Sequence, residues 1–314
     1  MRVGIWLGEI IKEDIGGAAT FQSNLLHEMI NNKYNHQFYF IIDYDGNHKK
    51  LIKTYDDSLN IINLKKTQNN SKVNFFNKKL QNKINLLNDE LQKNKIDFCW
   101  IACPSYVDIN CPYAFTVWDL AHRLHTYFPE VSLSGWKFDD REQFYQRMIN
   151  KSSYVIIGNK EGAKQVNQFY NYPIERIKTI AMPTPNYVYE LKSEDSFIEK
   201  NNLIAKQYLF YPAQFWPHKN HIAILNAFKI LLQKNESFKN FKIVFTVSNK
   251  GNEEHIKEKT HEYGLEKFVK FLGFVKKEQV ISLYQNAFAL VYPSMFGPDN
   301  IHPLEAMALN CPVI

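Results

Sequence analysis

The 314 residues of the chain suffice for two α/β domains of ordinary size. With 45% hydrophobic and 15% aromatic residues, the composition excludes a disordered protein. The net charge of +6 comes mainly from lysine, and arginine is too scarce for a typical nucleic-acid-binding face, so we expect no nucleic-acid partner. The sequence contains no apolar run of about eighteen residues that would predict a membrane-spanning helix.

The start of the chain and its cysteines indicate a cytoplasmic protein. The first residues, MRVGIWLGEI, lack the basic-then-apolar order of a signal peptide and predict a strand. Cys99, Cys103, Cys111 and Cys311 show no paired metal-binding spacing. We therefore expect reduced, mostly buried thiols and no metal site.

Short apolar segments alternate with amphipathic ones through the first half of the chain. Strands are predicted at 3–7, 38–42, 98–102, 114–118, 154–158 and 177–181. Helical patterns begin near residues 20 and 72, and the second carries one apolar stripe of Phe76, Leu80, Ile84, Leu87 and Leu91. This alternation predicts a parallel sheet with helices on both faces.

The lysines that flank the stripe at 75–91 leave two interpretations open. The helix could lie on the anionic inner leaflet of a membrane, as a peripheral contact. Alternatively, the stripe packs on the sheet and the lysines form a solvated face, which is the interpretation that we favour.

Two loops early in the chain carry residues that suit phosphate or sugar binding. Gly16 and Gly17 precede a predicted helix, where free N–H groups can bind an anion, although the spacing differs from GxGxxG and a plain turn is the alternative. Asp43 and Asp45 follow the second strand, where they could hold a ribose or a metal. Asp45-Gly46 is also a strong turn signal, and the turn is favoured.

A polar loop follows the strand at 114–118 and carries Asp119, His122 and Arg123. Its place at a strand end makes Asp119 and His122 candidates to line a site. The spacing of His122 and His125 would suit half of a metal site, but no nearby carboxylate or third histidine completes one.

The segment 183–202 carries prolines and no sustained periodicity, and it predicts a linker. We therefore expect an N-terminal Rossmann-like domain at 1–182 and a second domain at 203–314. In the second domain, strands are predicted at 208–212, 241–247, 268–273 and 288–293, with helices from about His221, Glu253 and Lys276. Two such lobes would face each other across a cleft, with ligands beyond the carboxyl ends of the strands.

Lys219 and Glu305 occupy strand-end loops of this second domain. Lys219 lies near a predicted helix start, where an ammonium and free N–H groups could hold a phosphate, although a lone lysine is usually a surface residue. Glu305 lies in the first turn of a helix with Pro303, where a carboxylate complements the helix dipole or could accept ribose hydroxyls.

A resemblance is carried by three segments of the second half, FYPAQFWPHKN, VKFLGFV and LVYPSMFGPDNIHPLEAMALNCPVI. In sequence and in order, these segments resemble the group 1, family-4 retaining glycosyltransferases. TVWDLAHRLHTYFPEVS and the Gly16–Gly17 loop are similar to that family's first lobe. The resemblance implies a GT-B fold and metal-independent sugar transfer with retention. It also implies a second lobe that continues beyond CPVI, so we expect a truncated chain that transfers sugar poorly.

The resemblance assigns roles to individual residues. Lys219 would neutralise the donor diphosphate, Glu305 would bind the ribose, and Gly16 and Gly17 would lie against donor or acceptor. The catalytic candidates are His122 and Asp119. The donor-binding candidates are Lys219, Glu305, Gln214, Gly297, Asn300 and Ile301.

Three positions depart from the family pattern. Gln214 stands where an arginine often accompanies the lysine, and Gly297 stands where a glutamate usually addresses the sugar. Backbone N–H groups at 297–300 are therefore expected to form a nest for the sugar. Trp118 replaces a frequent histidine, which leaves His122 as the nearest substitute.

The sequence thus predicts a glycosyltransferase that moves a sugar from a UDP- or GDP-sugar donor to a saccharide or lipid-linked acceptor in cell-surface polysaccharide synthesis. The nucleotide-sugar is its substrate, and no separate cofactor is expected. Two alternatives stay open. One is a Rossmann-type nucleotide- or dinucleotide-binding enzyme, and the other is a non-catalytic sugar-binding derivative of the fold.

Overall fold

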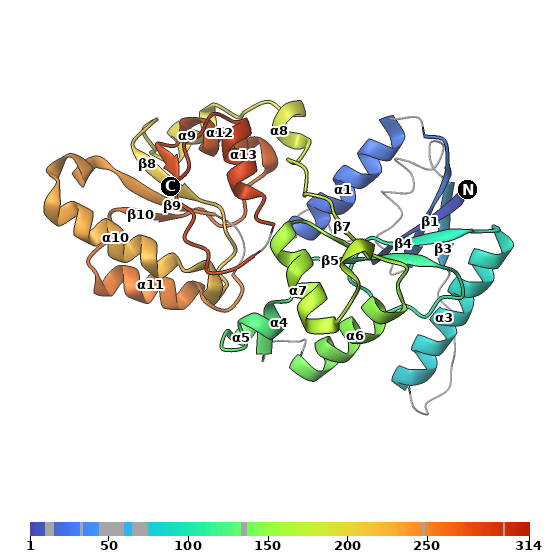
Figure 1. Ribbon diagram of the computed structural model, residues 1–314. Coiled ribbons are helices and arrows are strands. Elements are labelled where there is room, and N and C mark those ends of the chain that lie inside the picture. The colour runs from blue at the N-terminus through green and yellow to red at the C-terminus, as the bar shows by residue number, and fades with distance from the viewer. Residues whose placement is uncertain are drawn as a thin grey trace. The chain divides into compact units, whose positions relative to one another are not determined.

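The structure of the chain is a computed structural model, and it describes residues 1–9, 16–31, 34–43, 60–64, 75–132, 137–246, 249–297 and 299–314. Asp45 of the expected turn lies outside these residues. The chain forms two compact units (Figure 1). The first comprises Met1–Leu120 and Asp139–Met182, and the second comprises Ala121–Phe138 and Pro183–Ile314.

The first unit is built on a 7-stranded parallel sheet with the order β3-β2-β1-β4-β5-β6-β7. Its strands are β1 (Arg2–Glu9), β2 (Gln37–Asp43), β3 (Asn60–Leu64), β4 (Phe98–Ile101), β5 (Tyr113–Val117), β6 (Tyr154–Ile157) and β7 (Ile177–Thr179). The central strands are strongly apolar because helices bury the sheet on both faces.

Right-handed crossovers decide which face each helix of this unit covers. The order runs outward from β1 to β3 and then returns past β1 to β4, so the helices before and after that reversal lie on opposite faces. Figure 1 shows α1 (Gly16–Asn31) above the strands, and α3 (Phe75–Lys93) and α6 (Phe138–Lys151) below them. The helix α7 (Lys160–Tyr170) joins β6 to β7.

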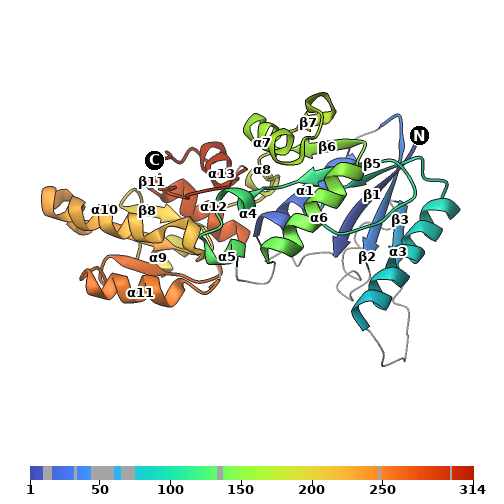
Figure 2. The same cartoon turned by 60° about the horizontal axis from the view of Figure 1, so that its bottom comes forward.

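The second unit holds a 4-stranded parallel sheet with the order β10-β9-β8-β11. Its strands are β8 (Tyr208–Tyr211), β9 (Lys242–Phe245), β10 (Val269–Phe271) and β11 (Ala289–Leu290). The order reverses after β10, and α10 (His221–Lys234) and α11 (Glu253–Glu262) accordingly lie on one side of the sheet (Figures 1 and 2). The helices α12 (Lys277–Asn286) and α13 (His302–Ala308) lie on the other side. Val313 adds one parallel bridge to Leu290.

The predicted α/β class with two parallel sheets is confirmed, and every strand predicted from the sequence is present. The strand β3 was not predicted. Two short helices, α8 (Tyr187–Glu190) and α9 (Ser196–Lys200), lie in the segment 183–202, which the sequence analysis treats as a linker. Residues 121–138 contain α4 (Ala121–Leu124) and α5 (Pro129–Ser132), and they pack within the second unit although they lie between β5 and α6.

The core of the second unit is rich in aromatic side chains. Phe210, Phe245 and Tyr284 are almost completely buried, and Phe228 of α10 contacts the ring of Phe268 in an edge-on arrangement. Burial of these rings provides the main stabilisation of the unit because each removes a large apolar area from water. Among the described residues, no helix is long and apolar enough to cross a membrane.

Replacing Phe228 by alanine should lower the free energy of unfolding by about 3–5 kcal/mol, since the site is 1% exposed and the lost ring leaves a cavity. Urea unfolding measures the change. Ile230→Ala on the same helix is the matched control, because Ile230 is 50% exposed and should cost less than about 1 kcal/mol. Equal costs for the two variants would contradict the packing described for α10.

Candidate functional site

The candidate site lies where the loops after two neighbouring strands meet. The strands β8 and β11 are adjacent and parallel, so the loops that follow them leave the same edge of the sheet. Lys219 ends a 3₁₀ turn, Pro217–Lys219, in the loop after β8. Its backbone is fixed from two sides: its N–H donates to the carbonyl of Trp216 at 3.0 Å, and its carbonyl accepts from the hydroxyl of Tyr211 at 2.7 Å.

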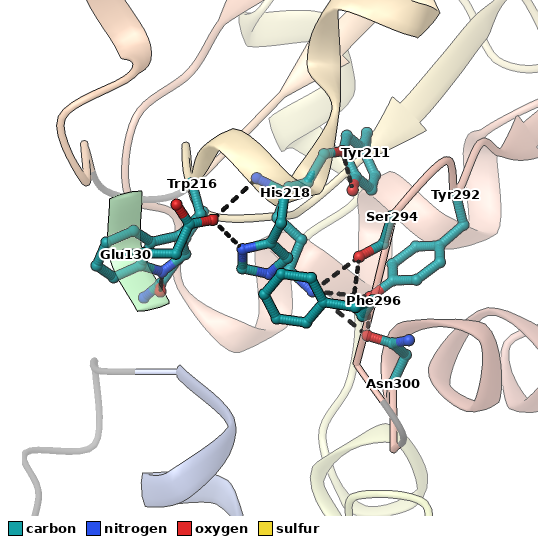
Figure 3. A network of polar contacts seen from close by, with 10 residues as sticks. Glu130, Tyr211, Trp216, His218, Tyr292, Ser294, Phe296 and Asn300 are labelled. Carbon is teal, nitrogen blue, oxygen red and sulfur yellow. Dashed lines mark hydrogen bonds and ion pairs between the residues drawn. The ribbon is translucent and has the colours of Figure 1, made fainter. Parts of the chain in front are cut away.

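The Lys219 ammonium contacts three side-chain oxygens from the loop after β11 (Figure 3). Its Nζ lies 3.3 Å from the Tyr292 hydroxyl, 3.4 Å from Ser294 Oγ and 3.3 Å from Asn300 Oδ1. The Tyr292 hydroxyl also donates to Asn300 Oδ1 at 2.6 Å. All three acceptors are neutral, so these contacts orient the ammonium without neutralising its charge.

Burial sets the electrostatics of this group. Loss of water around the ammonium lowers the pKa of Lys219 to about 8, and the negative charge of Glu130 opposes that shift. The group is therefore mostly charged at neutral pH, and a bound anion would raise its pKa again by stabilising the charged form. A partly desolvated cation of this kind is suited to an anionic ligand such as a diphosphate.

Gly297 and Asn300 are coupled by close packing. Gly297 adopts φ +129°, and Asn300 Nδ2 donates to its carbonyl at 2.7 Å. A Cβ at Gly297 would lie 2.7 Å from Asn300 Oδ1, the atom that accepts from Lys219. A glutamate at this position, the residue that the resemblance leads one to expect, is therefore incompatible with the observed loop. In this loop, the Asn300 side chain contacts the lysine. The backbone nest expected at 297–300 includes Pro298, which lies outside the described residues.

Glu305 lies in the first turn of α13 and is 5% exposed. Its Oε2 accepts from the Tyr284 hydroxyl at 2.9 Å, and Tyr187 of α8 also hydrogen-bonds to the carboxylate. Burial raises the pKa of Glu305, and these hydroxyls oppose the rise. A carboxylate has about four acceptor positions, so capacity for further hydroxyl donors remains. Ile301 contributes its carbonyl, which accepts from the Glu305 N–H at 3.0 Å.

The other residues proposed from the sequence have separate environments. Gln214 Oε1 accepts from the indole of Trp216 at 3.0 Å. Asp119 belongs to the first unit, where it pairs with Arg141, and His122 belongs to the second unit and is completely buried. In the first unit, Gly16 begins α1 and the Cα of Gly17 faces open space. Within the second unit, the structure thus brings together Lys219, Gly297 and Asn300.

Sequence reasoning missed several residues of this network, namely Tyr292, Ser294, His302 and Glu130. Tyr292 and Ser294 directly follow β11, and their place at a strand end was the available signal. His302 stacks on Tyr292 with ring centroids 5.7 Å apart, and burial lowers its pKa to about 4, so it is neutral at physiological pH. Glu130 lies 88 residues before His218, which it contacts, and no local pattern indicates that contact.

Gly297→Ala should destabilise the protein by about 1–3 kcal/mol, because a side chain is strained at this φ and the added Cβ meets Asn300. Gly251→Ala is the control for backbone strain alone, since Gly251 has φ +95° and no described residue lies within 4 Å of its added Cβ. Urea unfolding should show a larger cost at Gly297. That excess should shrink when both variants are repeated with Asn300→Ala, and an unchanged excess would refute the coupling.

The lowered pKa of Lys219 predicts how stability depends on pH. Between about pH 8 and the ordinary value of 10.5, the folded protein releases a proton that the unfolded chain still binds, so the free energy of unfolding should rise with pH. The difference between wild type and Lys219→Met should shift in favour of wild type by about 1–2 kcal/mol from about pH 7 to about pH 9.5. Urea unfolding at both pH values measures it. The same comparison with Lys234→Met, an exposed lysine at the end of α10, should show no such shift.

The second half of the chain is similar to a known protein family. Residues 193–314 match the model of the family described as "Glycosyl transferases group 1". The O-antigen chain mannosyltransferase B of Escherichia coli is 24% identical over 208 residues, which cover 62% of this chain and 54% of that protein. The chain thus spans about half the length of this curated relative.

Solved glycosyltransferase structures have the same fold. WaaG, a glycosyltransferase involved in lipopolysaccharide biosynthesis, matches with a TM-score of 0.66 at 16% identity, over 99% of this chain and 80% of that one. HepE from Anabaena, solved in complex with UDP-glucose, matches with a TM-score of 0.64 at 16% identity, over 100% of this chain and 79% of that one. Lys219, Asn300 and Glu305 all lie within the segment that matches the family model. Residues 193–314 of the second unit therefore match the group 1 glycosyltransferase family, and the chain is similar in fold to a solved glycosyltransferase.

Proposed function

We propose that the protein transfers a sugar, with retention, from a nucleoside-diphosphate sugar to a saccharide or lipid-linked acceptor in cell-surface polysaccharide synthesis. The observation that carries this proposal is the Lys219 ammonium, which is partly buried among neutral oxygens at the carboxyl ends of β8 and β11. Such a cation meets the one group that every donor of this class shares, the diphosphate.

The proposed mechanism uses that charge where the reaction needs it. Cleavage of the bond between sugar and diphosphate leaves additional negative charge on the diphosphate oxygens, and a preoriented ammonium stabilises this charge more in the transition state than in the bound donor. Tyr292, Ser294 and Asn300 hold the ammonium in place before the donor arrives. Glu305 would accept the ribose hydroxyls with its remaining acceptor capacity.

Two comparisons support this donor and acceptor class. The O-antigen mannosyltransferase relative acts in cell-surface polysaccharide synthesis, and HepE was solved with UDP-glucose. We propose a UDP- or GDP-sugar as the donor substrate, with no separate cofactor. We further propose a cytoplasmic site of action, with peripheral contact between the lysine-flanked helix α3 and an anionic membrane as an addition to it.

The roles of the remaining candidates rest on the family resemblance. Asp119 and His122 are proposed to act on the reacting sugar, and Gly16 and Gly17 to lie against donor or acceptor. The observed pairing of Asp119 with Arg141 and the complete burial of His122 equally fit structural roles. Activity measurements on variants of Asp119 and His122 therefore need a parallel measurement of folding.

Lys219→Met should weaken the binding of UDP or GDP by about 10- to 100-fold, because a charge-assisted contact to the diphosphate is lost. Titration calorimetry with UDP, GDP and NAD, on wild type, Lys219→Met and the surface variant Lys234→Met, measures the effect. Lys234→Met should bind like wild type.

The same titrations separate the alternatives. Preferential binding of NAD would indicate a dinucleotide enzyme, and the absence of any nucleotide binding would overturn the proposed donor class. Binding of UDP or GDP, together with no sugar transfer to saccharide or lipid-linked acceptors in a separate activity assay, would favour the non-catalytic derivative of the fold.

A further inference from the structure

A buried carboxylate from a distant part of the chain holds the turn that carries Lys219. Glu130 lies in α5, and its Oε1 accepts from the backbone N–H of His218 at 2.9 Å (Figure 3). The same oxygen pairs with His218 Nδ1. The side chain of Glu130 is 7% exposed and that of His218 is 11% exposed, so solvent screens their interaction only weakly. Both residues belong to the second unit.

Aromatic packing joins this contact to the loop that contacts Lys219. The ring of Phe296 stacks on His218 with centroids 4.1 Å apart and on His125 with centroids 4.8 Å apart. The N–H of Met295 donates to the carbonyl of His218 at 2.8 Å. The turn 217–219 is therefore fixed on one side by residues 125–130 and on the other by residues 294–296, next to the Ser294 hydroxyl that contacts the ammonium.

The charge of Glu130 is only partly compensated by hydrogen bonds. Its second oxygen, Oε2, is buried and has no hydrogen-bond partner among the described residues. A buried carboxylate in this situation favours nearby positive charge, because burial has removed the water that would stabilise it. His218 contacts the Glu130 carboxylate directly. The charge of Glu130 also acts on Lys219, the residue that follows His218.

Four buried titratable groups near Lys219, all among the described residues, keep one charge state near neutral pH. Burial lowers the pKa of His221 in α10 and of His302 in α13 to about 4, so both are neutral. Burial also raises the pKa of Tyr211, the last residue of β8, and of Tyr292, after β11, so both stay protonated. The groups left to consider are His218, on the same turn as Lys219, and Glu130.

We infer that Glu130 is a positioning residue for the donor site: it fixes the turn 217–219 through His218 and places a buried negative charge beside the turn that carries the Lys219 ammonium. This inference rests on the proposed function for the identity of the ligand. Its physical part, the action of Glu130 on Lys219, exists in the ligand-free protein and can be measured there.

The test is an NMR titration of the whole chain labelled with ¹³C-lysine, without ligand, from about pH 6 to pH 10. The Lys219 signal is assigned by its absence in Lys219→Arg. In Glu130→Gln, which keeps an acceptor for the His218 N–H but removes the charge, the Lys219 midpoint should fall by about one pH unit from its wild-type value near 8. Glu130→Asp retains the charge and should stay close to wild type. Glu236→Gln, whose side chain is 87% exposed, should leave the midpoint unchanged.

Calorimetric titration with UDP separates this inference from the proposed function. If the inference and the proposed function both hold, the affinity of wild type for UDP falls above about pH 8. In Glu130→Gln, this fall in affinity begins about one pH unit lower. A purely structural role for Glu130 would instead weaken UDP binding equally at all pH values. An unchanged Lys219 midpoint in folded Glu130→Gln overturns the inference, whether or not UDP binds. If Glu130→Gln does not fold, a wild-type midpoint in Glu130→Ser serves the same purpose. A shifted midpoint without UDP binding supports the action of Glu130 and refutes the proposed ligand.

The NMR comparison of Glu130 with Glu130→Gln is repeated in a His218→Gln background, which removes the imidazole. Loss of the midpoint shift in that background would assign the shift to His218 and overturn the direct effect of Glu130.

Discussion

Placing an ammonium group where most of its water is lost is the constraint around which the second unit's strand-end loops are organised. Desolvation is unfavourable unless oxygen atoms replace the water, and Tyr292, Ser294 and Asn300 supply them. Because these oxygens are neutral, the lysine retains a charge that an incoming anion can pair with. The order of the sheet makes the arrangement available, since β8 and β11 are neighbours although 77 residues lie between Tyr211 and Ala289 along the chain.

The departure at Gly297 follows from the same constraint. Asn300 offers the lysine an amide oxygen, which orients the ammonium without cancelling its charge. The amide can reach the ammonium because the glycine allows φ +129° and leaves room for the asparagine side chain. The two residues therefore act together: the glycine leaves room for a neutral contact to the lysine, and the acidic influence on the lysine comes from Glu130.

Local sequence patterns predicted most of the fold and part of the site. Apolar runs such as those at 3–7 and 208–212 revealed their strands because buried parallel strands are apolar on both faces. The strand Asn60–Leu64 was missed because it is short and carries asparagine at two of its five positions, a residue that is depleted in strands. Strand-end position pointed to Lys219, but it pointed equally to His122, which is fully buried. Glu130 was beyond reach, since a contact between residues 88 positions apart leaves no trace in local periodicity.

Residues 121–138 belong to the second unit, although residues 139–182 of the first unit separate them from the rest of it in the sequence. This division affects how related proteins can be recombined. The polypeptide changes unit at 120/121, 138/139 and 182/183, so neither unit is one continuous stretch of sequence. A chimaera spliced once, near residue 182, would combine the Glu130 of one parent with the Lys219 turn of another. The mismatch would fall on the contacts between the two segments, namely the hydrogen bond from His218 to Glu130 and the stack of His125 with Phe296. The natural module for exchange is therefore discontinuous: the eighteen-residue excursion 121–138 has to travel with residues 183–314.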